Sequence, residues 1–494
     1  MPRNLKIVLL TFAALMVWTF FVHNRFPQKA PLSEPTNQIA DNQGLSQTTE
    51  QEQPLNKIAT FAEVTTETKD FEIGEYFVKV SEMGGYISEI SFINDQNPLN
   101  ISYIGLVPGE EQKPFTVARD GDSLIFVSGE NTTKKFIFEN FTISLLLNYT
   151  PESIIFFHNY QSKNGLDQRY QEIFYGQGPQ IIRNPHQKQK QSLLSNINFI
   201  GTRDRYYCFS LLKGNYTVNL LKDAKRGVSA LLNFPSSEVQ FFVGPQKSEI
   251  LNEYGLSEII NFGFFHTIAL FLLKIILFFH FLTKNFGFSI ILFTIFLYAV
   301  FLPLTIKSTK GMKGMQDFQA IHKSEIEKLR QKYKDNPQKI HKETMDLYKK
   351  HGFNPLKGCS SGCLPMFFRI PVIWAFWSIA PRFWGFKGAN FLWINDLSNP
   401  DHLFKLPFTL PVVGNWINIL PILTTVLLFL QMKMSNPNVD PEQKQQQQMM
   451  ATIFPIMLAV FLYNLPAALL LYWFTDSILT FFTQRKLMKV KSTN

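Results

Sequence analysis

The sequence predicts a polytopic α-helical membrane protein with six spans, to which a large all-β sandwich domain is attached. Three observations carry this prediction. Hydrophobic residues make up 46% of the 494 residues, and many of the 49 phenylalanines lie in long uncharged runs, which is typical of lipid-facing helices rather than of one soluble core. Basic charge is confined to two segments, and a central region shows the short alternating runs of β-strands.

The net charge of +10 lies almost entirely in residues 307–357 and in the tail after Gln484. The first segment holds thirteen basic and six acidic residues, the tail holds four basic ones, and the rest of the chain is close to neutral. Cytoplasmic loops of membrane proteins carry this excess of lysine and arginine. We therefore expect both segments, and both chain termini, on the cytoplasmic side.

The N-terminal region is typical of a membrane anchor followed by a tether. Leu5–Val22 is an apolar run behind a short basic start, and no small-residue cleavage site follows it. These features predict an uncleaved signal anchor over residues 1–25. Residues 26–60 are polar and poor in aromatic side chains, which predicts a flexible linker.

Residues 61–256 have the pattern of an all-β domain. Runs such as Tyr76–Ser81 and Glu238–Val243 alternate or are rich in β-branched and aromatic side chains, and turn-forming residues separate them at hairpin-like spacing. This pattern predicts a β sandwich. Because the domain follows one outward span, we expect it on the far side of the membrane.

Residues 257–285 and 286–306 are each long and apolar enough to cross a membrane. If both crossed it, the strongly basic segment that follows would lie outside, against the positive-inside rule. Lys274 also interrupts the apolar surface of the first stretch. We therefore predict an amphipathic helix in the membrane interface over 257–285, and span 2 over 286–306.

The remaining segments alternate between polar loops and apolar spans. Residues 307–358 predict a cytoplasmic basic helical hairpin broken at Asp335-Asn336-Pro337, because proline is disfavoured inside a helix. The apolar stretch Met449–Gln484 is too long for one span, and Asn464-Leu465-Pro466 supplies a break. The predicted order after the hairpin is span 3 (359–382), an outer loop (383–415), span 4 (416–433), a cytoplasmic loop (434–448), span 5 (449–464), span 6 (466–484) and a basic tail (485–494).

The sequence gives little indication of a catalytic or metal-binding site. The three cysteines, Cys208, Cys359 and Cys363, are too few for a disulfide framework, and C-S-S-G-C has no companion ligands nearby to complete a zinc site. The sequence contains no HExxH and no paired aspartates within a span. We therefore expect no metal and no cofactor, and we do not predict an enzyme.

Three polar side chains on three predicted spans are expected at one depth. Counted from Cys363 with about 1.5 Å of rise per helical residue, Arg369 lies roughly 9 Å inside the cytoplasmic edge of span 3. Asp476 in span 6 and Tyr298 in span 2 lie roughly 12 Å inside by the same rise. Thr294 and Gln431 are placed to join this layer.

Two interpretations of the layer remain open. Arg369 either extends to the interface or forms a structural pair with Asp476, or these groups line a water-containing cavity open to the cytoplasm and the bilayer. In the second case the positive charge would hold the polar or acidic flank of a passing peptide. A purely structural pair is easily replaced by apolar residues, which favours the cavity.

The order of several motifs from about Phe286 to Lys489 resembles the YidC family of bacterial membrane protein insertases, also called inner-membrane 60 kDa proteins. In the region 61–256 only Met83-Gly84-Gly85-Tyr86-Ile87 is similar to the family. The C-terminal motifs are Gly287-Phe288-Ser289-Ile290-Ile291 with Pro303-Leu304-Thr305, Asn354-Pro355-Leu356 through Cys363-Leu364-Pro365, Ile370-Pro371-Val372, Leu392-Trp393-Ile394 with Asp396-Leu397, Gln447-Gln448-Met449-Met450, and Pro466 through Leu471-Tyr472-Trp473.

The resemblance implies an insertase of the bacterial inner membrane. Five of the six spans would form its core, around a hydrophilic groove open to the cytoplasm and lipid and closed outward, and the periplasmic domain would be a sugar-mutarotase-like β sandwich. Nascent membrane proteins would be its clients, with an apolar wall formed by Ile373, Phe461 and Trp473. The Sec translocon is an expected partner, and the basic tail would contact the ribosome or anionic lipid. No small-molecule substrate is implied.

One departure from the family pattern concerns the groove charge. The family usually places an arginine in the second span, four residues after a threonine and five before a proline. Here Thr294 and Pro303 are present, but the arginine position is Tyr298, whereas Arg369 stands where the third span usually has a glutamine. Our hypothesis is that the charge has moved across the groove; the alternative is an independent loss and gain.

The main alternative function is a transporter or channel in which Arg369 and Asp476 form a substrate or proton site. Against it, the predicted spans show no inverted repeat, and those after the first hold only these two charges away from their ends.

Overall fold

The structure is a computed structural model. The predicted anchor (1–25) and linker (26–60), and Cys359 and Cys363, lie outside the described residues. The chain divides into two compact units, with the boundary between Asn261 and Phe262. The described residues are 68–93, 99, 101–129, 132–159, 170–178, 180–184, 191–212, 214–223, 227–233, 238–333, 336–351, 369–410, 414–434 and 453–489.

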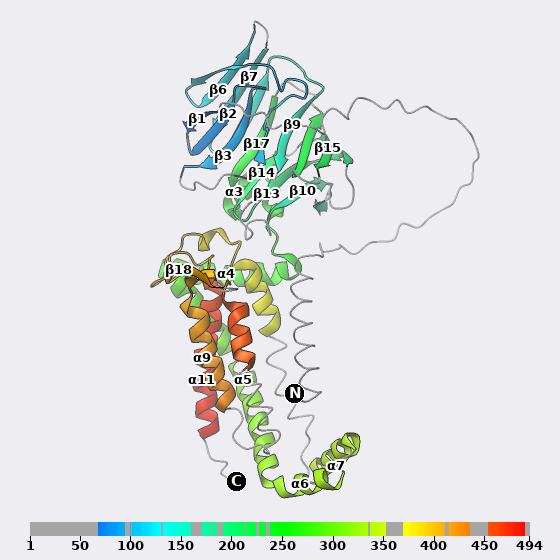
Figure 1. Cartoon of the computed structure of the whole chain (residues 1–494), viewed down its shortest axis with the longest axis vertical. Coiled ribbons are helices and arrows are strands. Elements are labelled where there is room, and N and C mark those ends of the chain that lie inside the picture. The colour runs from blue at the N-terminus through cyan, green and yellow to red at the C-terminus, as the bar shows by residue number, and fades with distance from the viewer. Residues whose placement is uncertain are drawn as a thin grey trace, which may run out of the picture. The chain divides into compact units, whose positions relative to one another are not determined.

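The first unit is a β domain built from three antiparallel sheets (Figure 1). Their strand orders are β1-β2-β3, then β11-β10-β13-β14-β17-β8-β7-β6-β5, and β12-β15-β16-β9-β4. Helix α3 (Ser248–Glu253) and the turn η3 (Ser257–Ile259) follow the last strand. The strands are β1 Thr68–Ile73, β2 Tyr76–Ser81, β3 Tyr86–Phe92, β4 Ile101–Ser102, β5 Thr116–Asp120, β6 Ser123–Ser128, β7 Thr132–Glu139, β8 Thr142–Leu147, β9 Ser153–Asn159, β10 Glu172–Gln177, β11 Gln180–Arg183, β12 Gln191–Ile197, β13 Phe199–Arg203, β14 Tyr207–Leu211, β15 Tyr216–Asp223, β16 Gly227–Asn233 and β17 Glu238–Pro245.

Aromatic side chains join the sheets face to face. Phe156 on β9 stacks on Phe209 of β14, with ring centroids 4.7 Å apart, and Phe92 on β3 stacks on Tyr207 of β14 at 4.4 Å. Tyr207 and Phe209 are two residues apart on one strand and therefore point to the same face. Both smaller sheets thus pack on one face of the nine-stranded sheet, and the predicted all-β domain is confirmed.

Lys134 on β7 is a charged residue inside this β core, and its side chain is fully buried. Its Nζ donates to the backbone oxygens of Gly84, at 2.8 Å, and Gly105, at 3.3 Å. It also lies 3.0 Å from Glu110 Oε2 and 4.8 Å from the centroid of the Phe115 ring. Burial lowers the pKa of the Lys134 amine to about 8, although Glu110 acts in the opposite direction.

The second unit is helical, apart from a small hairpin of β18 (Phe404–Leu410) and β19 (Gly414–Ile417) (Figure 1). Helix α11 packs against both α5 and α9, and α4 packs against α5. The helices are η4 Gly263–Phe265, α4 His266–Thr283, α5 Phe286–Ile321, α6 Lys323–Lys332, α7 Pro337–Lys350, the helix Arg369–Ile379, η5 Trp384–Phe386, α9 Ile419–Met434, the helix Ile453–Leu462 and α11 Ala467–Lys489.

A sharp corner separates α4 from α5. Lys284 ends α4 in the left-handed conformation, with φ 55°, and the side chain of Asn285 caps α5 by accepting from the Phe288 amide. Helix α4 therefore runs crosswise to α5 (Figure 1). It buries one side, including Leu272, and exposes Phe271 and other large apolar residues on another. Its location in the membrane interface stays a prediction.

Two described helices, Gly263–Thr283 and Phe286–Gly311, are long and apolar enough to cross a membrane by length and composition. Three further apolar helices, Arg369–Ile379, Ile419–Met434 and Ile453–Leu462, are shorter. All three adjoin residues outside the described part. The count of six spans, five of them in a core, therefore stays a prediction.

The basic hairpin is built differently from the two-helix prediction. Helix α5 continues beyond residue 306 to Ile321, with Pro303 inside it, so the first basic residues extend the span 2 helix. Helix α6 then starts after a break at His322. At the one predicted break, the Asn336 side chain accepts from the Lys339 amide and Pro337 opens α7, as proline suits the first helical turn.

Asp401 fixes the start of α9. Its side chain is almost fully buried, and Oδ2 accepts from the Ile419 amide at 2.8 Å, the Leu420 amide at 3.0 Å and the indole N–H of Trp393 at 3.2 Å. A carboxylate suits this position because the first amides of a helix have no intrahelical partner and carry partial positive charge.

We expect Asp401→Ala to lower stability by about 3 kcal/mol, because three buried donors lose a charged acceptor. Asp401→Asn keeps the shape and one acceptor oxygen, so it should cost clearly less. Thermal unfolding of the detergent-solubilised chain, followed by tryptophan fluorescence, measures both. Equal midpoints for the wild type and the alanine variant would show that this contact contributes nothing.

Candidate functional site

Arg369 and Asp476 form an ion pair between two helices. Arg369 begins the described part of the helix Arg369–Ile379, and its Nη1 lies 3.0 Å from Oδ2 of Asp476 on α11. The Arg369 side chain is 20% exposed and the Asp476 side chain is 19% exposed. Nη2 of Arg369 is buried and has no hydrogen-bond partner among the described residues. Within the described part of the chain, the guanidinium group thus has an unused donor next to its counter-ion.

Tyr298 of α5 lies against this pair. The guanidinium carbon of Arg369 is 5.8 Å from the centroid of its ring, within the range of a cation–π contact. Its hydroxyl is 2.7 Å from Thr483 Oγ1 and 3.1 Å from the backbone oxygen of Leu479 on α11. The structure therefore brings together Arg369, Asp476 and Tyr298, which the sequence placed in one layer on three spans.

Thr294 and Gln431 make different kinds of hydrogen bond near this group. Thr294 is buried one turn before Tyr298, and its hydroxyl donates to the Ile290 backbone oxygen at 2.6 Å. The Gln431 amide donates to the backbone oxygen of Ser477 at 2.7 Å, which ties α9 to α11 beside Asp476. Thr294 uses its hydrogen within its own helix, and Gln431 connects two helices.

The predicted apolar wall is spread over three helices. Phe461 stacks on Trp377, with ring centroids 5.6 Å apart and an interplanar angle of 28°. Ile373 is half-buried and lies one turn from Trp377 and from Arg369 on the same helix face. Trp473 is half-buried on α11, one turn before Asp476. Trp377, which sequence reasoning missed, is thus the residue that Phe461 contacts.

An aromatic cluster joins three helices next to the ion pair. The rings of Phe293 on α5, Phe376 on the helix Arg369–Ile379, and Tyr472 on α11 have centroids 5.3 to 6.1 Å apart. All three side chains are buried. Phe293 precedes Tyr298, Tyr472 precedes Asp476 and Phe376 follows Arg369, so the cluster lies on the predicted outer side of the charges. In a chain with 49 phenylalanines, sequence gives no signal that selects these rings.

Apolar helices around a paired charge, in a chain that also carries a separate β domain, are typical of an integral membrane protein, and comparison with known proteins shows which family the chain resembles. Residues 278–494 match the model of the 60Kd inner membrane protein family. The predicted resemblance to YidC-type insertases is confirmed.

Two curated relatives illustrate the match. The membrane protein insertase YidC of Pelobacter propionicus is 34% identical over 311 residues, which are 60% of this chain and 55% of the relative. That of Geotalea daltonii is 36% identical over 257 residues, covering 51% and 44%. The alignments thus span about half the length of the curated relatives. The alignment with a solved structure of an active YidC insertase covers 87% of this chain and 96% of the chain in that structure. The sequence identity is 19% and the TM-score is only 0.41.

Proposed function

We propose that this protein is a membrane protein insertase and chaperone, which inserts integral membrane proteins and helps them fold through a cytoplasm-open hydrophilic groove that carries Arg369. It would act alone or with the Sec translocon. The observation that carries the proposal is the Arg369 guanidinium group, which is held among three helices with one nitrogen paired to Asp476 and the other without a partner among the described residues. Curated relatives are named membrane protein insertases.

The proposed mechanism requires no covalent chemistry. A charged group deep among spanning helices is costly unless water or a partner solvates it, and the unused Nη2 donor of Arg369 suits an acidic or polar flank of a client. Further along α11, Oε1 of Gln484 is also buried and lacks a hydrogen-bond partner in the described part. Water between these positions would satisfy both groups. A polar client segment would then meet a lower desolvation cost than in lipid.

The apolar side of the groove would take the client's hydrophobic stretch. Phe461 keeps 36% of its surface exposed, and it adjoins Trp377 near Ile373. The aromatic cluster of Phe293, Phe376 and Tyr472 would close the route outward, because its buried rings fill the space between three helices. A client helix would therefore leave sideways into the bilayer.

The basic segments would act on the cytoplasmic side of the inner membrane, where both termini would also lie, and the β domain would lie in the periplasm. The hairpin 307–358 would contact the nascent client or partner proteins, and the tail 485–494 would contact anionic lipid or the ribosome. The simpler role for both segments is to orient the protein in the membrane.

A transporter or channel is the second candidate. Its supporting observation is the direct 3.0 Å contact between Arg369 and Asp476, because ion pairs within spanning helices mark substrate or proton pathways in such proteins. Substrate-dependent flux through the purified protein in liposomes would favour it, whereas an insertase needs no such flux.

Photocrosslinking of a stalled nascent membrane protein tests the insertase function. A photoreactive residue in place of Trp473 should capture the client's hydrophobic segment, because Trp473 lies one turn from Asp476. The matched control is Phe482 on the same helix, which is 60% exposed and nine residues away, on the opposite helix face. Equal capture at both positions, or capture at neither, would contradict a client path along this face.

A further inference from the structure

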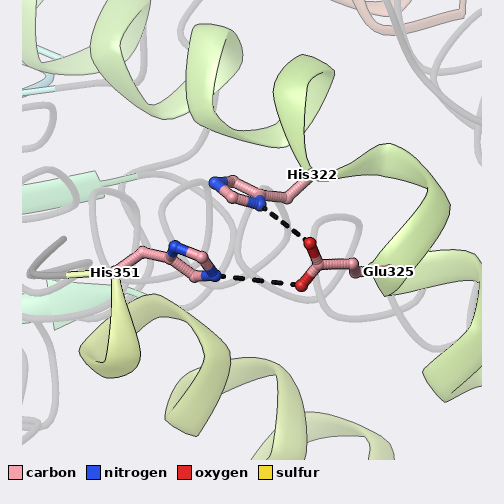
Figure 2. Close-up of side chains that lie close together, drawn as sticks. All are labelled: His322, Glu325 and His351. Carbon is pink, nitrogen blue, oxygen red and sulfur yellow. Dashed lines mark hydrogen bonds and ion pairs between the residues drawn. The ribbon is translucent and has the colours of Figure 1, made fainter.

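Three metal-binding side chains meet where the basic hairpin folds back on itself. His322 lies between α5 and α6, Glu325 is in the first turn of α6, and His351 directly follows α7 (Figure 2). His322 Nδ1 is 3.5 Å from Glu325 Oε1, and His351 Nε2 is 3.8 Å from Glu325 Oε2. One ligand atom from each residue lies within 4.8 Å of the other two.

A small aromatic core holds the two histidines in place. Phe318 and Tyr348 are both buried, with ring centroids 4.9 Å apart. The Phe318 ring lies 4.4 Å from His322 and 6.1 Å from His351, and the two imidazole rings are 4.1 Å apart. These ring contacts pack the end of α5 against the end of α7, so the cluster is positioned by the fold.

The spacing of the ligand atoms suits a bound cation better than direct hydrogen bonds. Hydrogen bonds from nitrogen to oxygen are usually about 2.7–3.2 Å long, which is shorter than both contacts to Glu325. Two ligands of a tetrahedral metal ion with bonds near 2.1 Å lie about 3.4 Å apart. Small rotations of exposed side chains would bring all three atoms to that spacing, since Glu325 is 49% exposed and His351 is 35% exposed.

We propose that His322, Glu325 and His351 bind a divalent transition-metal ion of the Zn²⁺ type. Two imidazole nitrogens and one carboxylate oxygen form a donor set that such ions prefer, and the fourth position would be left to water. The partial exposure of the cluster gives the ion access from solvent. The bound ion fastens the C-terminal end of α7 to the corner between α5 and α6.

Metal binding would make the hairpin more rigid and dependent on pH. The ion stabilises the closed hairpin by mass action, because the opened hairpin lacks the site. Affinity falls as the pH drops, because protons compete with the metal for the imidazole nitrogens. Without an ion, the same side chains form only weak ion pairs with protonated histidine.

Titration of the untagged full-length protein in detergent with Co²⁺, and then with Zn²⁺ in competition, tests the proposal. The background is Cys359→Ser/Cys363→Ser, because these cysteines also offer metal ligands. We expect one saturable site per chain, with the visible spectrum of tetrahedral Co²⁺. His322→Gln, Glu325→Gln and His351→Gln should each weaken binding by about 100-fold or more, since even residues that only orient metal ligands contribute about 10–100-fold.

Glu327→Gln is the matched control, because Glu327 is an exposed carboxylate on the same helix that pairs with Lys323. It should bind like the wild type. Hydrogen exchange provides a second readout: Zn²⁺ should slow exchange at the end of α7 in the wild type and in Glu327→Gln, but not in His351→Gln. Lack of a saturable site, or equal affinity in the three ligand variants, would overturn the proposal.

Discussion

Arg369→Gln is expected to reduce insertion of a short single-span client into proteoliposomes by at least about tenfold, a difference of roughly 1.4 kcal/mol. The substitution removes the donor that we assign to the client's polar flank. It also leaves the Asp476 carboxylate, 19% exposed, without its counter-ion, and an unpaired carboxylate would repel an acidic client flank. Protected client segments after protease treatment measure insertion.

The relocation variant Tyr298→Arg/Arg369→Gln should recover insertion. The Tyr298 ring centroid lies 5.8 Å from the Arg369 guanidinium carbon, so an arginine at 298 places its charge in nearly the same space, from the opposite helix. Recovery would support the hypothesis that the groove charge moved between two helices.

A third variant separates a groove charge from a structural ion pair. Arg369→Gln/Asp476→Asn removes both charges together, so it leaves no uncompensated carboxylate. Comparing such a double variant with the single variants separates the effect of the ion pair from the effect of each residue alone. If Arg369 serves only to neutralise Asp476, this double variant should insert clients normally. If Arg369 holds the client, it should fail as Arg369→Gln does. Normal insertion by Arg369→Gln itself would contradict the groove-charge hypothesis outright.

The layer of polar groups could be predicted because the helical rise is nearly constant. Counting residues from the span ends placed Arg369, Asp476 and Tyr298 at similar depth, and the structure brings all three together. The contacts themselves could not be predicted, because they depend on how each helix is rotated about its axis. The sequence therefore left open whether Arg369 pairs with Asp476.

Other features depend on contacts between segments that are distant in the sequence. The β domain could be predicted as a class from its alternating runs, but its three sheets and their strand orders depend on pairings such as β17 with β8. In TTKKFIFE, Lys134 and Lys135 are equivalent by residue type, although Lys134 shares its face with the buried Phe136. His351 likewise joins His322 only because the hairpin folds back.

Lys134→Met should destabilise the β domain by about 3 kcal/mol at neutral pH. The change removes the ammonium group that donates to the backbone oxygens of Gly84 and Gly105 and pairs with Glu110, and breaking a buried pair on one side typically costs about 3–5 kcal/mol. The lower end applies because Glu110 keeps two other partners, Lys113 Nζ and the Tyr149 hydroxyl. Hydrogen exchange of the β7 amides in the full-length chain measures the local free energy of opening.

The dependence on pH identifies the buried amine as the cause. Its folded pKa is about 8, below the ordinary value of 10.5, so between these values the unfolded chain binds more protons than the folded one. Wild-type stability must therefore rise with pH across this window, by up to about 3 kcal/mol from this group. Lys134→Met lacks this contribution, so the difference between wild type and variant should widen from pH 8 to 10.5.

Lys135→Met, on the opposite face of β7, is the matched control for both measurements. Its side chain is only partly buried, so its removal should change the opening free energy little and leave no added dependence on pH. If the difference in opening free energy between wild type and Lys134→Met instead narrows above pH 8, burial does not destabilise the charged form of the Lys134 amine. In that case the charge of the ammonium group, paired with Glu110, would account for its stabilising effect, because that contribution is lost when the amine deprotonates.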